Sequence, residues 1–197
     1  MNAPDPSPRN EALVLIDFQR GFDDPWWGPR NNPEAEDNAL RLLAAFRQQG
    51  LAVFHVRHLS TEAGSPLAGQ GARFKDGFGP VPGEVLIEKT VNSAFIGTDL
   101  EAQLRKREIG HLTICGLTTP HCVSTTTRMA ANLGWPVTLV HDACAAFARN
   151  ADTSFDNGPA FAPEEIHRAA LAQLHGEFAN VTATDAVLGR ITGDMHS

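Results

Sequence analysis

Three side chains that could do chemistry each follow an apolar run of strand length: Asp17, Lys89 and Cys122. A thiol attacks a carbonyl carbon once it loses its proton, a carboxylate can accept and return that proton, and an ammonium favours both charged forms. Taken singly, a cysteine is more often a small buried hydrophobe, an aspartate a turn former and a lysine a solvated group. Their shared placement after three strands favours a cysteine-dependent hydrolase.

Apolar runs alternate with segments of helical periodicity along the chain, which is typical of a parallel α/β protein. The expected strands are Ala12–Ile16, Ala52–Val56, Val85–Ile87, Leu112–Cys115, Pro136–Val140 and Val181–Thr184, the last at a sheet edge, and the expected helices cover 32–49, 99–107, 121–133 and 163–177. We therefore predict a three-layer α/β/α fold with a doubly wound, mainly parallel, Rossmann-like sheet of six strands. The carboxyl ends of parallel strands meet at one edge, where Asp17, Lys89 and Cys122 can converge.

Cys122 is expected at the start of the helix that follows the fourth strand. The positive end of the helix dipole and the free N–H groups there should lower the pKa of the thiol. We assign Asp17 as the general base and acid, and Lys89 as the charge that keeps Asp17 ionised and favours the thiolate. The two other cysteines receive no such role: Cys115 is expected to be inert core and Cys144 structural.

Length and composition indicate one domain and exclude several classes of partner. The 197 residues with 42% hydrophobic content suffice for one sizeable core. We expect a domain over 11–190 between a flexible N-terminal tail, 1–10, and a C-terminal tail, 191–197. The net charge of −7 and the lack of a basic run argue against nucleic acid and anionic membranes as partners, and favour a neutral or cationic small molecule. No run of eighteen apolar residues and no leader-like N-terminus are present, so we expect a cytoplasmic protein.

Three segments resemble the isochorismatase-like hydrolase superfamily. The first is GLTTPHCVSTTTRMAANLGWPVTLVHDA (Gly116–Ala143), with Gly-x-x-Thr-x-x-Cys-Val before a helix and Asp-Ala after a strand. The others are ALVLIDFQRGF (Ala12–Phe22) and EKTVNSAFIGTDLEAQL (Glu88–Leu104). The similarity extends from about Glu11 to Glu177. The resemblance implies that Asp17, Lys89 and Cys122 are the catalytic residues of an amide-type hydrolase, and that the protein is a dimer or tetramer.

The resemblance also implies a cis peptide bond at Leu117–Thr118, before the nucleophile. In the family this bond turns the N–H of Thr118 toward the substrate carbonyl, so that Thr118 and Cys122 form an oxyanion hole through their backbone N–H groups. Related enzymes include isochorismatases, which hydrolyse a vinyl ether without needing a thiol nucleophile. The dianionic substrate of that reaction would require a cationic pocket. The candidates are Arg20, Arg30, Arg57 and Arg73, but the sequence gives no indication that they lie close together.

The region after the second strand lacks the metal-binding pattern of nicotinamidase-like relatives. Those proteins use Asp-x-His and a further His, whereas this chain has HVRHLS (His55–Ser60) with no Asp. On a strand, His55 and His58 point to opposite faces, so we interpret both as core or hydrogen-bonded residues. We therefore predict neither a metal nor a cofactor.

Aromatic residues near the predicted strand ends are candidates for the substrate pocket. Phe22, Trp26 and Trp27 follow the Asp17 strand, Phe95 follows Lys89, and His121 adjoins Cys122. Such rings suit a planar or apolar group, although they could equally pack a lid or a subunit contact. The long segment Ser60–Gly83 is expected to be a functional loop.

Two alternatives to amide hydrolysis stay open. One is isochorismatase-type vinyl-ether hydrolysis. The other is a non-catalytic ligand-binding α/β module, since Thr118, Thr119 and Pro120 precede a helix that could hold an anion. No GxGxxG or GxxxxGK[ST] motif supports a nucleotide site. Asp142, near the end of the fifth strand, is expected to cap or hydrogen-bond a neighbouring loop.

Overall fold

A six-stranded parallel sheet forms the centre of the protein, whose computed structural model describes residues 10–156 and 158–193. The strand order is β3-β2-β1-β4-β5-β6, and each neighbouring pair runs parallel. The prediction of a doubly wound α/β fold is confirmed. The strands are β1 (Glu11–Ile16), β2 (Ala52–His58), β3 (Val85–Lys89), β4 (His111–Leu117), β5 (Val137–Ala145) and β6 (Asn180–Thr182).

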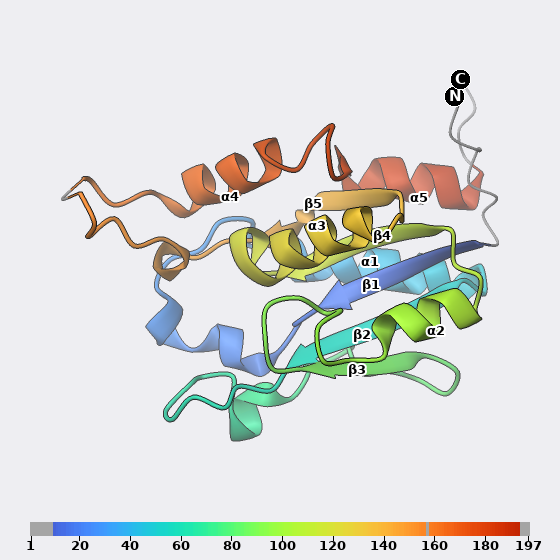
Figure 1. The fold of residues 1–197 in the computed structure, drawn as a ribbon, viewed down its shortest axis with the longest axis horizontal. Helices are drawn as coiled ribbons and strands as arrows, with labels where there is room; N and C mark the ends of the chain where they lie inside the picture. The colour runs from blue at the N-terminus through green and yellow to red at the C-terminus, as the bar shows by residue number, and fades with distance from the viewer. Residues whose placement is uncertain (1–9, 157, 194–197) are drawn as a thin grey trace.

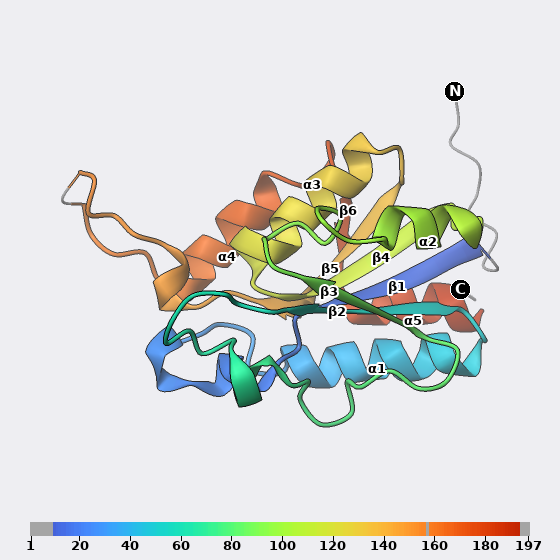
Figure 2. The ribbon, with the colours of Figure 1, turned by 60° about the horizontal axis from the view of Figure 1, so that its bottom comes forward.

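Helices cover both faces of the sheet and give it three layers (Figure 1, Figure 2). One face carries α1 (Ala35–Gln48) and α5 (Thr184–Thr192); on the other side lie α2 (Leu100–Lys106), α3 (Ser124–Asn132) and α4 (Pro163–Ala172). All six residues of β1 are buried, as a central strand between two helical layers requires. Among the described residues, no helix has the length and apolarity needed to cross a bilayer.

The helix α1 shows how the sequence pattern produces a layer. Its apolar positions Ala39, Leu42, Leu43 and Phe46 recur at helical spacing, and all of them are buried. The polar residues between them face outward. These buried side chains pack α1 against one face of the sheet, which contains β1.

The helix α5 was not predicted, and its N-terminus is stabilised from a distant strand. Oδ1 of Asp142, in β5, accepts hydrogen bonds at 2.8 Å from both the backbone N and the Oγ1 of Thr184. The expected capping role of Asp142 is thus confirmed. Because α5 continues to Thr192, the C-terminal tail does not begin at 191 as expected. The tail segments 1–9 and 194–197 lie outside the described residues.

Gly116 allows β4 to approach β1 at the carboxyl edge of the sheet. Its φ is +144°, and a Cβ atom there would lie 2.2 Å from the carbonyl oxygen of Ile16. The β4–β5 register also shifts between Ile114 and Gly116. Only glycine fits such a position without displacing the neighbouring backbone. The ends of β1 and β4 flank the point where the strand order reverses, which is where open α/β sheets bind ligands.

Candidate active site

The side chains of Asp17, Lys89 and Cys122 meet at this edge of the sheet. Nζ of Lys89 lies 2.6 Å from Oδ2 of Asp17 and 3.2 Å from Sγ of Cys122. Asp17 and Lys89 are fully buried, whereas 8% of Cys122 is exposed. The structure therefore brings together the three residues that the sequence singled out, with only the sulfur facing a cavity.

Asp17 has an unusual backbone conformation directly after β1. Its φ is +54°, which is uncommon for a residue other than glycine, although aspartate adopts it more readily than most residues. The backbone N–H of Asp17 donates to the carbonyl oxygen of Val56 at 2.9 Å, which fixes this turn. Oδ2 of Asp17 contacts Lys89, while the buried Oδ1 has no hydrogen-bond partner within the described residues. That second oxygen is free to accept a proton.

Lys89 is the last residue of β3 and reaches across β2 to the other two groups. In the ladder it is paired with His58, the last residue of β2. Burial alone would lower the pKa of Lys89, but the negative charge of Asp17 and the interactions of Lys89 with Asp17 and Cys122 outweigh burial and raise it. The ammonium is therefore a permanent charge of the site at neutral pH.

Cys122 lies in a π-helical turn, Thr119–Val123, that precedes α3. Burial and the charge of Asp17 raise the pKa of the Cys122 thiol to about 12, although Lys89 acts in the opposite direction. We expected a lowered pKa from the helix N-terminus, and this expectation is wrong because burial and the carboxylate dominate. The resting group is a thiol, so a base must remove its proton as it reacts.

His58 is a fourth polar group of the site, and the sequence did not identify it. Its Nδ1 lies 3.3 Å from Nζ of Lys89, and its ring lines the cavity beside Cys122. Burial and the charge of Lys89 lower the pKa of His58, so the ring is neutral at pH 7. The strand was expected to end at Val56, two residues too early, which hid the position of His58 at the carboxyl edge. His55 points the other way, as expected, and contacts Glu84 at 2.7 Å.

Asp17, His58 and Cys122 could in principle hold a metal ion, because their ligand atoms all lie within 4.8 Å of one another. However, Nζ of Lys89 lies within 3.3 Å of an atom of each. The ammonium already supplies the positive charge at the centre of this group, and a divalent cation would have to displace it. These donors therefore fit the lysine better than a metal.

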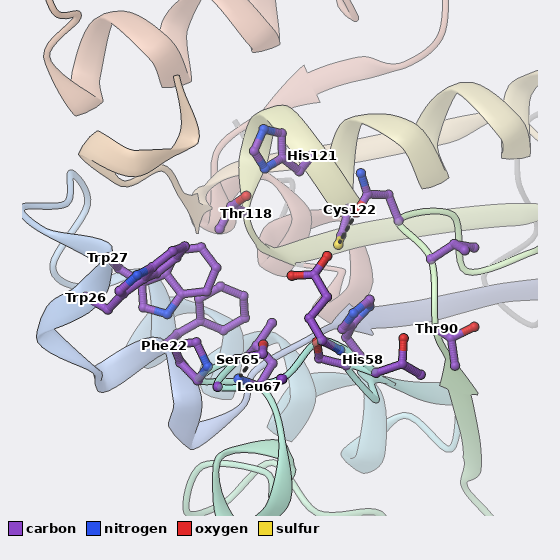
Figure 3. Close-up of a pocket in the computed structure, with 18 residues that line it drawn as sticks. Phe22, Trp26, Trp27, His58, Ser65, Leu67, Thr90, Thr118, His121 and Cys122 are labelled. Carbon is purple, nitrogen blue, oxygen red and sulfur yellow. Dashed lines mark hydrogen bonds between the residues drawn. The ribbon is translucent and has the colours of Figure 1, made fainter. Parts of the chain in front are cut away.

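A cavity of about 420 Å³ opens above the sulfur. Figure 3 shows Phe22, Trp26 and Trp27 on one side of it and Cys122 and His58 on the other. Thr118 and His121, from the turn that carries Cys122, also line it. The Leu117–Thr118 peptide bond is cis in the structure. Four of the five expected pocket residues therefore line the cavity: Phe22, Trp26, Trp27 and His121.

Phe95 lies elsewhere, and its expected place in the pocket is corrected. Its ring is buried and stacks on Trp135, with the centroids 5.9 Å apart. The chain turns inward after Thr90, Val91 and Asn92, which line the cavity in its place. Proximity to Lys89 in the sequence was therefore a poor guide.

The segment from Ser60 to Leu67 forms a wall of the cavity, in agreement with a functional loop. Two glycines allow the backbone at Pro66 to pack closely against them. A Cβ atom on Gly21 would lie 2.2 Å, and one on Gly71 1.8 Å, from the carbonyl oxygen of Pro66. Gln19, fully buried, binds the backbone at the start of the loop. Its amide donates to the carbonyl oxygen of His58 at 2.9 Å and accepts from the N–H of His58 at 2.7 Å.

The other two cysteines are unsuited to catalysis. Cys115 and Cys144 are fully buried, and all three cysteines are free. Burial raises the pKa of the Cys144 thiol to about 12 and that of Cys115 well above its ordinary range. Neither lines the cavity, so the expected structural roles agree with their positions.

Comparison with known proteins identifies the family. The isochorismatase domain model matches residues 11–186. The chain belongs to the isochorismatase family. An uncharacterised isochorismatase family protein of Bacillus subtilis, YrdC, is 44% identical over 182 residues, covering 90% of this chain and 94% of that protein.

A solved structure of an isochorismatase-family hydrolase from Chromobacterium violaceum is 41% identical to this chain. It superposes with a TM-score of 0.88 and covers 98% of this chain and 100% of its own. A more distant relative is the ureidoacrylate amidohydrolase RutB of Caulobacter segnis, 28% identical over 182 residues, which are 89% of this chain and 64% of that protein. The protein is thus an isochorismatase-family hydrolase, and amidohydrolases occur among its relatives.

Proposed function

We propose that the protein hydrolyses the C–N bond of a small amide through a thioester on Cys122. The observation that supports this best is the position of its sulfur, at the floor of the cavity and 3.2 Å from Nζ of Lys89. The free Oδ1 of Asp17 provides a base nearby. A relative named as an amidohydrolase supports the same class of reaction.

Acylation begins with transfer of the Cys122 proton to Asp17 as the sulfur bonds to the amide carbon. The electrons of the carbonyl double bond move to oxygen, and the N–H groups of Thr118 and Cys122 stabilise the oxyanion. When the intermediate collapses, the C–N bond breaks and Asp17 gives its proton to the departing amine. A thioester and free ammonia or amine result.

Deacylation repeats these steps with water. Asp17 takes a proton from water, whose oxygen attacks the thioester carbon, and the second oxyanion is held by the same N–H groups. The C–S bond then breaks, the carboxylic acid leaves, and the sulfur recovers its proton from Asp17. Throughout, Lys89 stabilises whichever of Asp17 and Cys122 carries the negative charge.

Isochorismatase-type vinyl-ether hydrolysis is the alternative, and the cavity disfavours it. A dianionic substrate needs cationic side chains, but none of the four candidate arginines lines the cavity. Arg20 pairs with Asp76, Arg30 with Glu36 and Arg57 with Glu88. Membership of a hydrolase family likewise favours an enzyme over a non-catalytic binding module.

The test is release of ammonia from a panel of small primary amides. We expect Cys122→Ala to reduce the rate to the uncatalysed background and Cys144→Ala, a matched change of a buried thiol, to retain most of it. Mass spectrometry of quenched reactions should find the acyl group on Cys122. If Cys122→Ala keeps the wild-type rate, or if only vinyl ethers are hydrolysed, the proposal is wrong.

Three further proposals concern the setting of the reaction. We propose that the substrate is a small molecule, that the protein acts in the cytoplasm without a cofactor, and that it forms a dimer or tetramer. Light scattering after size-exclusion chromatography measures the last of these, and a monomer at micromolar concentration would contradict it.

A further inference from the structure

Three aromatic side chains, Phe22, Trp26 and Trp27, form the wall of the cavity opposite Cys122. The ring centroids of Trp26 and Trp27 lie 4.8 Å apart with their planes at 88°, and Phe22 lies 4.7 Å from Trp27. The indole N–H of Trp27 donates to the carbonyl oxygen of Gly21 at 2.8 Å, which fixes that ring. Trp26 is 47% exposed. This exposure leaves aromatic surface of Trp26 open to contact with a cation.

A carboxylate belongs to the same cavity. Among the cavity-lining side chains, Glu62 is the one with a fixed formal charge, since burial lowers the pKa of His58 and of His121, which are then neutral at pH 7. Within the described part of the chain, the carboxylate of Glu62 makes no hydrogen bond or ion pair. By contrast, Asp23 pairs with Lys75, and Glu36 with Arg30 and Lys75. Glu62 is therefore available to a ligand.

Within the protein, Trp26 already contacts one cation. The guanidinium of Arg149 lies 4.5 Å from the ring centroid of Trp26. Arg149 is not among the residues that line the cavity, and no ion pair joins it to Glu62 within the described residues. The excess of acidic residues in the chain, with a net charge of −7, further favours the approach of positively charged molecules.

We propose that this enzyme selects small amides that carry a positive charge, such as an alkylammonium group, at the end remote from the scissile carbonyl. The carbonyl lies over Cys122, and the cationic group lies between Glu62 and the exposed surface of Trp26. This inference rests on the proposed amide hydrolysis and names its substrate class. It also agrees with the lack of lysine and arginine among the residues that line the cavity.

The experiment measures the binding of three amides of similar size to Cys122→Ala by calorimetry, so that turnover does not interfere. The probes are the amide of β-alanine trimethylated on its nitrogen, its neutral analogue with carbon in place of that nitrogen, and the anion succinamate. We expect the cationic amide to bind about tenfold more tightly than the neutral one, and succinamate to bind most weakly.

Substitutions then locate the selectivity. Glu62→Gln should remove most of the difference between the cationic and neutral amides, and Trp26→Leu should reduce it further. Glu101→Gln, the same change on α2 away from the cavity, should leave it intact. Equal affinity for the cationic and neutral amides, undetectable binding of the cationic amide at millimolar concentration, or an unchanged preference in Glu62→Gln would overturn the inference.

The proposed chemistry fails on different results. If the wild-type protein releases ammonia from neutral amides in a Cys122-dependent manner with no charge preference, the substrate class is wrong and the thioester mechanism stands. If the cationic amide binds selectively through Glu62 but Cys122→Ala turns it over at the wild-type rate, the mechanism is wrong and the selectivity stands.

Discussion

The ammonium of Lys89 lies 2.6 Å from Oδ2 of Asp17, and both side chains are inaccessible to solvent. Each charge compensates the other in a medium where an isolated charge would be costly. Because Cys122 alone of the three lines the cavity, a substrate contacts the sulfur while the ion pair acts from beneath it. The first two of the four predictions below follow from this arrangement.

Asp17→Asn should separate the reactivity of the thiol from turnover. The charge of Asp17 contributes to the raised pKa of Cys122, so its removal should lower that pKa and speed alkylation by iodoacetamide near pH 9. The loss of the base should slow ammonia release by about 10²–10⁴-fold. Peptide mass spectrometry follows alkylation of Cys122. A variant that is alkylated more slowly than wild type, or that keeps full activity, would contradict the assignment.

Lys89→Met should destabilise the fold by about 3–5 kcal/mol, because it leaves a buried carboxylate without its partner. The free energy of unfolding in urea measures this loss. The double variant Asp17→Asn/Lys89→Met should recover part of the stability, since no buried charge then remains. Lys106→Met, at an exposed position of α2, is the matched control. Equal stabilities of the single and double variants would show that the pair is not coupled.

Stability should fall as the pH falls below 6.5, in part because of His167. This residue lies on α4, and its ring is buried, with Nδ1 2.8 Å from Oγ1 of Thr119. Burial lowers the pKa of His167 to about 4. An unfolded histidine has a pKa of about 6.5. Between these values the unfolded chain binds a proton that the folded chain excludes. Acidification through this window should therefore remove up to about 3 kcal/mol of stability through this group.

Urea unfolding at several pH values measures that slope. The slope should be shallower in His167→Gln and unchanged in His175→Gln, a change of an exposed histidine. A slope in His167→Gln as steep as that of wild type would exclude His167 as its source.

Gly21→Ala should damage substrate binding more than folding. A Cβ at this position would lie 2.2 Å from the carbonyl oxygen of Pro66 and would push the cavity wall away. We expect KM for the best amide of the panel to rise about tenfold. Gly79→Ala, where nothing lies within 4 Å of the new Cβ, is the control. An unchanged KM in Gly21→Ala would mean that this wall does not contact the substrate.

Much of the fold could be predicted because its strands are apolar runs with clear ends. The run Ala12–Ile16 lies within β1, and Asp17 follows it where expected. The convergence of Asp17, Lys89 and Cys122 then follows from the parallel topology. The helix α5 escaped prediction because the group that receives its first N–H, Asp142, lies in β5 and leaves no local signal.

The electrostatics of the site could not be predicted from local pattern. The position of Cys122 before a helix suggested a low thiol pKa, but its burial and the neighbouring carboxylate are properties of the packed molecule. His58 was missed because β2 extends two residues past its apolar run. Phe95 was placed in the pocket by its distance along the chain from Lys89, whereas the backbone directs it toward Trp135.

The wall that faces the sulfur of Cys122 is built from connecting segments, around Phe22–Trp27 and Ser60–Leu67, whereas Lys89 ends β3 and Asp17 directly follows β1. In the proposed reaction, this wall and the Asp17–Lys89 pair thus come from separate stretches of the chain. New specificities could be engineered by transplanting loops between family members without touching the reaction centre, and natural divergence could follow the same route.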